Sequence, residues 1–235
     1  MTDKKAANVV THRVGRKNDA TKKPRSAGAS PNVVWHEGEL TREARWPKIH
    51  GKGATLWLTG LSASGKSTIA CALEKALVGG GQPAYRLDGD NIRHGLNKNL
   101  GFSAEDRTEN IRRIGEVAKL FAESGCLAIA AFISPYRADR DLVRALHEQA
   151  ELPFLEVFAN ASIAVCEERD PKGMYKKARA GAIKGFTGID DPYEPPQRAE
   201  LVLETGELTV RECVDLCLGL LESRGLLLAR RAQTR

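Results

Sequence analysis

The sequence has no long apolar run, and its cysteines form no recognisable framework. The longest clean run, from Cys126 to Ile133, is far shorter than the roughly 18 residues of a membrane-spanning helix. No apolar signal-peptide core lies near Met1, so we expect neither membrane association nor secretion. No C-x-x-C pair occurs and no histidine lies at zinc-ligand spacing, which favours buried thiols in a reducing compartment and hence a cytoplasmic protein. The five cysteines are Cys71, Cys126, Cys166, Cys213 and Cys217.

The net positive charge of the chain is confined to one end. Of the 235 residues, 36 are basic and 30 acidic, yet residues 1–30 hold 8 of the basic and 2 of the acidic groups. The remaining residues are balanced, so a nucleic-acid-binding interpretation rests on this leader alone, and we expect no nucleic-acid partner. A hydrophobic fraction of 42% is enough for one large core. We expect a basic, disordered leader over 1–30, a folded domain over 31–225 and a short basic tail over 226–235.

Short apolar segments alternate with helical patterns along the rest of the chain. Ser103 is placed to cap a helix that Gly125 ends, and Thr209 with Glu212 forms a capping box for a last helix that ends at Gly225. Strands that are apolar throughout predict an α/β fold with a mostly parallel central sheet and helices on both faces. Ligands of such sheets bind at the carboxyl ends of the strands. We expect strands over 54–59, 83–87, 127–133, 154–159 and 201–204, and further helices over 66–78 and 137–150.

A phosphate-binding loop follows the first predicted strand. Residues 60–68, GLSASGKST, match G-x-x-x-x-G-K-[ST] between a strand and a helix, which is the context that this motif requires. Gly60 and Gly65 permit the close backbone approach of an anion-binding nest, and Lys66 can reach the β- and γ-phosphates. The hydroxyl of Ser67 is a suitable ligand for Mg²⁺. The alternative, a glycine-rich turn that binds nothing, does not explain why strand, helix, lysine and serine agree.

An acidic turn and several arginines follow the second predicted strand. Asp88 and Asp90 lie at the same sheet edge as the phosphate loop, where a carboxylate can orient Mg²⁺ or accept a proton from an attacking hydroxyl. Aspartates also favour turns and helix caps, so the pair alone is a weak signal. Arg93 and Arg107 suit an anion clamp for a second substrate, although surface ion pairs along a helix are common. Asp88 is our first choice for the base.

Two later segments are further candidates. Ser134 follows the third predicted strand, where a polar side chain is either a ligand contact or a cap, and the sequence leaves both open. The basic segment from Arg169 to Lys184 carries glycines that could act as hinges, and its charge could offset that of a moving phosphoryl group under a closing lid. The alternative is a solvated basic helix.

Together these residues give the chain a close resemblance to the adenylyl-sulfate kinase (APS kinase) family of P-loop kinases. The resemblance runs from about residue 32 to about 222, and the strings beyond the phosphate loop are specific to that family. The matching strings are NVVWHEG at 32–38, GLSASGKST at 60–68, LDGDNIRHGLNKNLGF at 87–102, EDRTENIRRIGEVAKLF at 105–121, FISPYR at 132–137, RDPKGMYKKAR at 169–179 and FTGIDDPYE at 186–194.

The resemblance implies a three-layer P-loop kinase fold and phosphorylation of the 3′-hydroxyl of adenylyl sulfate, with ATP as co-substrate and Mg²⁺ as cofactor. It also implies a homodimer. The two departures are the leader, which has no counterpart in the core pattern, and the absence of the sulfurylase domain often fused to this family, so we expect a free-standing kinase.

By motif position the resemblance assigns roles to individual residues. ATP would contact Gly60, Leu61, Ser62, Ala63, Ser64, Gly65, Lys66, Ser67, Thr68 and Arg169, and Mg²⁺ would bind Ser67 and, through water, Asp90. The acceptor would contact Asp88, Arg93, Phe102, Arg107, Asn110, Ile133, Ser134, Lys184 and Phe186, with Phe102 and Phe186 on either side of its adenine. Catalysis would depend on Asp88, Lys66 and Asp90, and Ser134 matches the family's phosphoserine position.

Three rival functions remain at this point. Another small-molecule P-loop kinase would use the same loop on a different acceptor. A nucleotide-dependent nucleic-acid-binding protein would depend on the leader, against which the balanced charge of residues 31–235 argues. A catalytically silent regulatory subunit is disfavoured because Lys66, Ser67, Asp88 and Asp90 are intact.

Overall fold

The computed structural model describes residues 32–34, 36 and 38–228. By its contacts the chain divides into two units, 1–39 and 40–235. The described residues of the first unit contain no helix or strand. Three sequence-based expectations lie outside the described residues. They are the expected leader over 1–30, Trp35 and Glu37 of the 32–38 string, and most of the expected tail. The helices and strands of the described residues all lie in the second unit, and the domain boundaries stay predictions.

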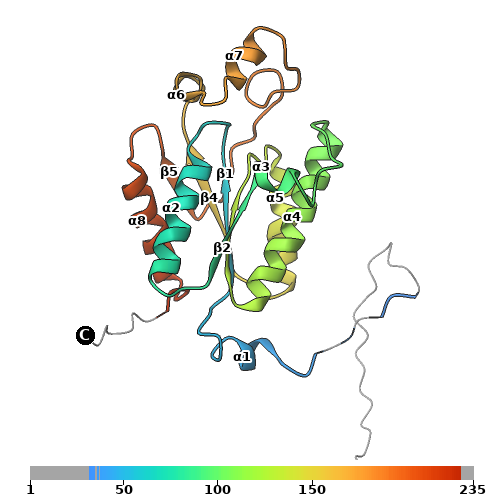
Figure 1. Cartoon of the computed structure of the whole chain (residues 1–235), viewed down its shortest axis with the longest axis vertical. Helices are drawn as coiled ribbons and strands as arrows, with labels where there is room; N and C mark the ends of the chain where they lie inside the picture. Colours follow the sequence, from blue (N-terminus) through green and yellow to red (C-terminus); the bar gives the residue numbers. More distant parts are fainter. Residues whose placement is uncertain (1–31, 35, 37, 229–235) are drawn as a thin grey trace, which may run out of the picture. The chain divides into compact units, whose positions relative to one another are not determined.

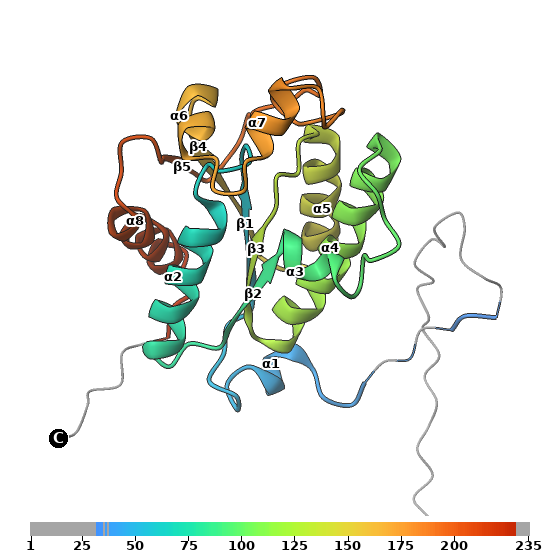
Figure 2. The same ribbon diagram turned by 45° about the horizontal axis from the view of Figure 1, so that its top comes forward.

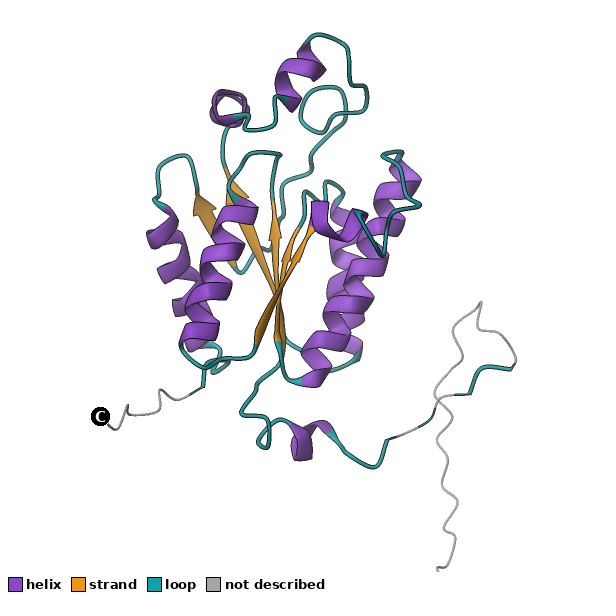
Figure 3. Cartoon of the chain, viewed as in Figure 1, coloured by secondary structure: helices purple, strands orange, loops and turns teal. Residues whose placement is uncertain are grey.

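The second unit is built on a five-stranded sheet in which every pairing is parallel, with the order β2-β3-β1-β4-β5 (Figures 1 and 3). The predicted α/β fold is confirmed. β1 lies in the middle of the sheet, and Leu56 on it pairs with Ile129 on one neighbour and Leu155 on the other. The strands are β1 (Ala54–Thr59), β2 (Ala84–Asp88), β3 (Leu127–Ala131), β4 (Phe154–Asn160) and β5 (Leu201–Glu204).

Helices cover both faces of this sheet, as Figure 2 shows. α2 and α8 lie on one face and α4 and α5 on the other, while α6 and α7 lie beyond the carboxyl ends of the strands. The helices are α1 (Arg42–Arg45), α2 (Lys66–Gly79), α3 (Gly89–Arg93), α4 (Ala104–Ser124), α5 (Arg137–Gln149), α6 (Ile163–Arg169), α7 (Met174–Arg179) and α8 (Val210–Ser223). Among the described residues, no helix is long and apolar enough to cross a membrane.

The alternation of side chains along β1 explains how one strand serves two cores. Leu56 and Leu58 pack under α2 and α8, whereas Trp57 between them points into the other core, under α4 and α5. All six residues of the strand are buried. Because successive side chains of a strand point to opposite faces, a strand covered on both sides buries apolar residues on both, and the hydroxyls of its two threonines, Thr55 and Thr59, are hydrogen-bonded.

The predicted helix ends are confirmed where a specific residue sets them. Ser103 accepts a hydrogen bond from the backbone N–H of Asp106 at 3.1 Å, and Gly125 ends α4 in a left-handed conformation (φ 98°). The capping box at Thr209 and Glu212 is present at the start of α8. These ends depend on contacts within a few residues, which is why the sequence predicts them well.

Two expectations are wrong. β3 ends at Ala131 rather than Ile133, because the carbonyl of Ile133 accepts a hydrogen bond from the Thr59 hydroxyl and the chain then turns through a left-handed Ser134 (φ 41°). Cys71 is exposed rather than buried. On α2 the residues that face the sheet recur at three and four from Ile69, and Cys71 falls on the opposite side. Cys166, Cys213 and Cys217 are buried as expected, and Cys126 is half-buried.

Candidate active site

The phosphate loop turns sharply between β1 and α2. Gly60 (φ 148°) and Gly65 (φ 95°) adopt left-handed conformations, and a Cβ on Gly60 would lie 2.5 Å from the carbonyl oxygen of Ala159. Glycine at position 60 therefore lets the loop pass close to β4. The rest of the motif follows into the first turn of α2, so its backbone N–H groups gather at a helix N-terminus, which favours an anion.

Lys66 is buried at the base of this loop. Its ammonium group donates hydrogen bonds to the carbonyl of Leu61 (2.5 Å) and to the hydroxyl of Ser64 (3.3 Å). Burial lowers the pKa of Lys66 from 10.5 to about 8. A cation that is costly to keep charged in its present surroundings is stabilised when a phosphate approaches.

The acidic turn caps the short helix α3. One carboxylate oxygen of Asp88 accepts a hydrogen bond from the N–H of Asp90 at 3.1 Å. The other oxygen lies 3.1 Å from Nη1 of Arg86 in an ion pair but accepts no well-aligned hydrogen bond. Asp90 is exposed and forms an ion pair with Lys172 from the segment between α6 and α7. Asp88 thus retains an acceptor oxygen with unused capacity.

Two arginines flank an exposed aromatic ring on the other side of the site. The guanidinium carbon of Arg93 lies 4.3 Å from the centre of the Phe102 ring, and that of Arg107 lies 5.8 Å from it. Arg93 also donates to the carbonyls of Leu100 and Gly101. Burial and the nearby charge of Arg107 lower the pKa of Arg93. Two adjacent cations and a ring that is 65% exposed form a surface suited to an anionic, aromatic ligand.

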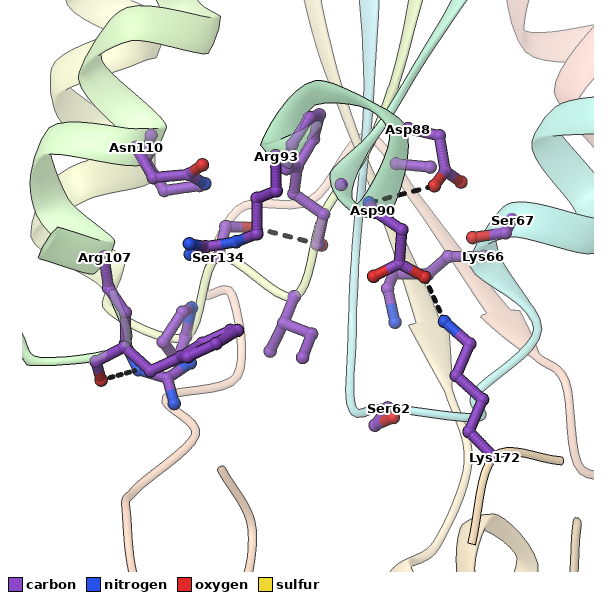
Figure 4. Close-up of a pocket in the computed structure, with 17 residues that line it drawn as sticks. Ser62, Lys66, Ser67, Asp88, Asp90, Arg93, Arg107, Asn110, Ser134 and Lys172 are labelled. Atoms are coloured by element: carbon purple, nitrogen blue, oxygen red, sulfur yellow. Dashed lines mark hydrogen bonds and ion pairs between the residues drawn. The ribbon is translucent and has the colours of Figure 1, made fainter. Parts of the chain in front are cut away.

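These groups line one cavity of about 170 Å³. Figure 4 shows Arg93, Arg107 and Asn110 on one side, Lys66 and Lys172 on the other, and Asp90 between them. The cavity brings together all but two of the predicted acceptor-binding residues. Its lining comprises Ser62, Lys66, Ser67, Asp88, Gly89, Asp90, Arg93, Phe102, Arg107, Asn110, Ile111, Ala131, Phe132, Ile133, Ser134, Pro135 and Lys172.

A second cavity, of about 570 Å³, adjoins the first on the α2 and α8 side. Arg169 contributes to its wall and is held there by a hydrogen bond to the carbonyl of Thr205 at 2.6 Å. Of the predicted ATP-binding residues, Ala63, Gly65, Lys66, Ser67, Thr68 and Arg169 line it. The residues common to both cavities are Lys66, Ser67, Asp88, Asp90 and Lys172.

Two of the predicted acceptor-binding residues, Lys184 and Phe186, line neither of these cavities, and neither do the predicted ATP-binding residues Gly60, Leu61 and Ser64. Lys184 is exposed, and Phe186 is 8% exposed with its ring edge-on to Tyr175 at 5.0 Å. Tyr175, on α7, donates a hydrogen bond to the carbonyl of Ser62 in the phosphate loop at 3.1 Å. The basic segment is therefore attached to the loop through an apolar cluster that also includes Leu61.

Ser134 lies in a turn beyond β3 and is almost fully buried. Its hydroxyl accepts a hydrogen bond from the indole N–H of Trp57 at 3.1 Å and donates one to the Thr59 hydroxyl at 2.9 Å. The sequence left open whether this serine is a ligand contact or a cap. In the structure it lines the first cavity and also belongs to a buried hydrogen-bond network.

Sequence reasoning missed several residues of the two cavities. Lys172 lies in the basic segment but had not been singled out, although its charge was a usable signal. The far wall of the second cavity comes from the loop after β5 and the start of α8, where the capping box of Thr209 and Glu212 predicts the start of a helix but no ligand site. That wall comprises Thr205, Leu208, Val210 and Cys213.

The parallel sheet, the phosphate loop and the acidic turn between adjoining cavities define a P-loop kinase. The sequence model of the family described as Adenylylsulphate kinase matches residues 52–204. The adenylyl-sulfate kinase of Staphylococcus carnosus is 58% identical over 195 residues, which cover 83% of this chain and 97% of that protein. Adenylyl-sulfate kinase 1, chloroplastic, of Arabidopsis thaliana is 53% identical over 87% of this chain and 74% of that protein.

A solved structure agrees with these relatives. The Mycobacterium tuberculosis APS kinase CysC in complex with AMPPNP and APS has a TM-score of 0.71 and 48% identity, over 73% of this chain and 99% of that one. The chain belongs to the adenylyl-sulfate kinase family.

Proposed function

We propose that this chain transfers the γ-phosphoryl group of ATP, bound in the second cavity, to the 3′-hydroxyl of adenylyl sulfate, bound in the first. As a member of its family the chain phosphorylates adenylyl sulfate, and the products are 3′-phosphoadenylyl sulfate and ADP. The observation that carries the proposal is that the two cavities share Lys66, Ser67, Asp88, Asp90 and Lys172. A donor and an acceptor that meet at shared residues need only be aligned for in-line transfer.

The donor site is formed by the phosphate loop. Its backbone N–H groups and Lys66 would hold the β- and γ-phosphates, and Arg169 would line the rest of the nucleotide site. Binding of phosphate would remove the penalty that burial places on the charged form of Lys66, so the lysine favours the bound state. Lys172 lies where it could offset charge on the phosphoryl group as it moves.

The oxygen groups at the shared residues fit a magnesium ion. The hydroxyl of Ser67 lines both cavities, and Asp90 is an exposed carboxylate. No cluster of three His, Cys, Asp or Glu side chains capable of holding a metal occurs among the described residues. This fits Mg²⁺, which commonly binds few protein ligands, substrate phosphates and several waters. Ser67 would bind it directly and Asp90 through water, and the ion would neutralise phosphate charge.

The acceptor site is assigned by its charges and its aromatic ring. Arg93, Arg107 and Asn110 would bind the sulfate–phosphate end or the ribose, and Phe102 would stack on the adenine. Phe186 would stack on the other face of the adenine and Lys184 would bind the same ligand, since the carbonyl of Gly185 between them accepts a hydrogen bond from Arg107 at 2.7 Å. Ile133 and Ser134 would complete the wall.

Asp88 would accept the proton of the 3′-hydroxyl. To test this, ADP release is followed with adenylyl sulfate, adenosine monophosphate and gluconate as acceptors, for the unmodified chain and for Asp88→Asn. We expect turnover with adenylyl sulfate alone and a fall in kcat of about 10²- to 10⁴-fold in the variant, with ATP binding retained. Equal turnover of another acceptor would contradict the function, and near-normal kcat in Asp88→Asn would contradict the assignment of the base.

We further propose a homodimer, a cytoplasmic location and a kinase domain spanning 31–225. Light scattering should give twice the mass of the chain. Cell fractionation should place the protein with cytoplasmic markers, unlike the Arabidopsis relative, whose name states that it is chloroplastic. Removal of residues 1–30 should leave the activity unchanged.

A further inference from the structure

One buried arginine outside both cavities joins three separate segments. Arg140, in the first turn of α5, has a side chain that is 1% exposed. Its guanidinium donates through Nε to Glu156 on β4 at 2.7 Å, and its two terminal nitrogens donate to the backbone carbonyls of Ser134 and Glu194, each at 2.6 Å. Two of its three bonds thus hold backbone rather than side chains.

The first of these carbonyls belongs to the turn after β3. Ser134 has a φ of 41°, which a residue with a side chain rarely adopts, and such a conformation persists only where its surroundings hold it. Trp57 and Thr59 hold the hydroxyl, and the carbonyl is held by Arg140 at 2.6 Å and more weakly by the Thr59 hydroxyl at 3.4 Å. Ile133, Ser134 and Pro135 line the first cavity, so the shape of its wall depends on this turn.

The second carbonyl belongs to the loop 187–195, which is fastened to the same turn. The N–H of Glu194 donates to the carbonyl of Pro135 at 2.9 Å, and the Glu194 carboxylate accepts from the N–H of Arg137 at 2.7 Å. Asp191 of this loop accepts a hydrogen bond from the Tyr136 hydroxyl at 3.2 Å and lies 4.0 Å from Arg107. Arg140 therefore links the turn 133–135 to the loop 187–195, and Asp191 of that loop pairs with Arg107 of the first cavity.

Stability alone does not account for this arrangement. Arg140 and Arg144 face Glu156 and Glu200, two charges of each sign in a largely buried group. Replacing such a group with apolar side chains is often neutral or stabilising. An apolar side chain could not donate hydrogen bonds to the carbonyls of Ser134 and Glu194. The planar guanidinium of Arg140 can donate to both at once.

We propose that Arg140 is a positioning residue for the acceptor. It fixes the turn 133–135 and the loop 187–195 relative to each other, and so sets the wall of the first cavity without touching the ligand. This rests on the proposed function, which assigns that cavity to adenylyl sulfate.

The experiment compares three variants with the unmodified chain. Arg140→Lys keeps the positive charge but loses the planar guanidinium that donates to two carbonyls at once. The paired change Arg140→Met with Glu156→Leu removes both charges and should keep the fold. Arg144→Lys is the matched control, since among the described residues the hydrogen bonds of Arg144 go to the carboxylates of Glu156 and Glu200 and to no backbone carbonyl. For each we measure kcat, the KM for adenylyl sulfate, the KM for ATP, and hydrogen exchange at the Trp57 indole N–H by NMR spectroscopy.

We expect both Arg140 variants to raise the KM for adenylyl sulfate about tenfold or more, with the KM for ATP changed less than about twofold. The Trp57 indole N–H should exchange faster in them, because its acceptor Ser134 is released. Arg144→Lys should change neither KM by more than about twofold. The proposal is overturned if the folded paired variant keeps a normal KM for adenylyl sulfate, or if Arg144→Lys shows the same split.

Two other outcomes are also decisive. If neither Arg140 variant folds, the residue serves folding rather than positioning. If the unmodified chain fails to phosphorylate adenylyl sulfate, the proposed function is wrong, while the Trp57 exchange still decides whether Arg140 holds the turn.

Discussion

The buried lysine of the phosphate loop leads to a pH dependence that can be worked out from the structure. Lys66 is 7% exposed, and burial lowers its pKa from 10.5 to about 8. The difference corresponds to about 3 kcal/mol that disfavours the charged form. Because the triphosphate binds the charged form, raising the pH through 8 should weaken capture of ATP by the free enzyme.

The size of the effect follows from the fraction of Lys66 that is protonated. With a pKa of about 8, about 90% of the ammonium group is charged at pH 7 and about 10% at pH 9, so kcat/KM for ATP should fall about ninefold. A lysine with an ordinary pKa would lose only a few per cent of its charge over this interval.

The assay is kcat/KM for ATP at fixed, saturating adenylyl sulfate and Mg²⁺ from pH 7 to 9.5. Bound phosphate favours the charged form of Lys66, so kcat at saturating ATP should change little over the same range. Lys66→Arg is the matched control, because a guanidinium stays charged throughout and its kcat/KM should be flat, whatever its absolute level.

Titration of Lys66 does not cause the protein to unfold as the pH rises, so unfolding through this residue cannot explain a fall in kcat/KM for ATP. Since the pKa of Lys66 is lower in the folded chain than in the unfolded one, the unfolded chain binds more protons between pH 8 and 10.5, and the contribution of Lys66 to folding free energy becomes more favourable as the pH rises. The reasoning is refuted if kcat/KM for ATP stays constant to pH 9.5, or if Lys66→Arg declines in parallel with the unmodified chain.

Two further predictions concern stability. Gly53→Ala should lower the free energy of unfolding by about 1–3 kcal/mol or more, because the new Cβ would lie 1.7 Å from the carbonyl oxygen of Ala122. The control Gly79→Ala, in open space at the end of α2, should raise the free energy of unfolding by about 0.5–1 kcal/mol. Equal effects of the two substitutions in urea unfolding would contradict the packing argument. Burial lowers the pKa of His147, so folding free energy should be lost as the pH falls from 7.5 to 5.5, and His147→Gln should reduce that loss. An undiminished loss in the variant, measured by urea unfolding at both pH values, would assign it to other groups.

Much of this molecule is predictable from sequence because its decisive features are local. The phosphate loop needs only glycines, a lysine and a serine between a strand and a helix, and it lies where the sequence puts it. The capping residues Ser103 and Thr209 act within three residues of their own position. For such features the sequence neighbours are also the spatial neighbours.

The parts that the sequence could not predict depend on contacts between distant segments. Phe186 packs against Tyr175 on α7. β3 ends early because the carbonyl of Ile133 accepts a hydrogen bond from the hydroxyl of Thr59, which is more than 70 residues away in the chain. Arg140 is an ordinary charged residue in a helical pattern until the fold places the carbonyls of Ser134 and Glu194 around it. No motif marks such a residue, since two of its three hydrogen-bond partners are backbone carbonyls.

The order of the strands explains why these long-range contacts matter for the chemistry. The phosphate loop follows β1 and the acidic turn follows β2, but β3 lies between these strands, with Ala131 paired to Leu58 on one side and to Asp88 on the other. Two strand spacings of about 4.8 Å therefore separate the phosphate loop from the acidic turn, a gap wide enough for a phosphoryl group and a hydroxyl. The turn that follows β3 forms the floor of that gap. On the proposed function, whatever holds this turn in its left-handed conformation would also set how deeply adenylyl sulfate enters between the phosphate loop and Asp88.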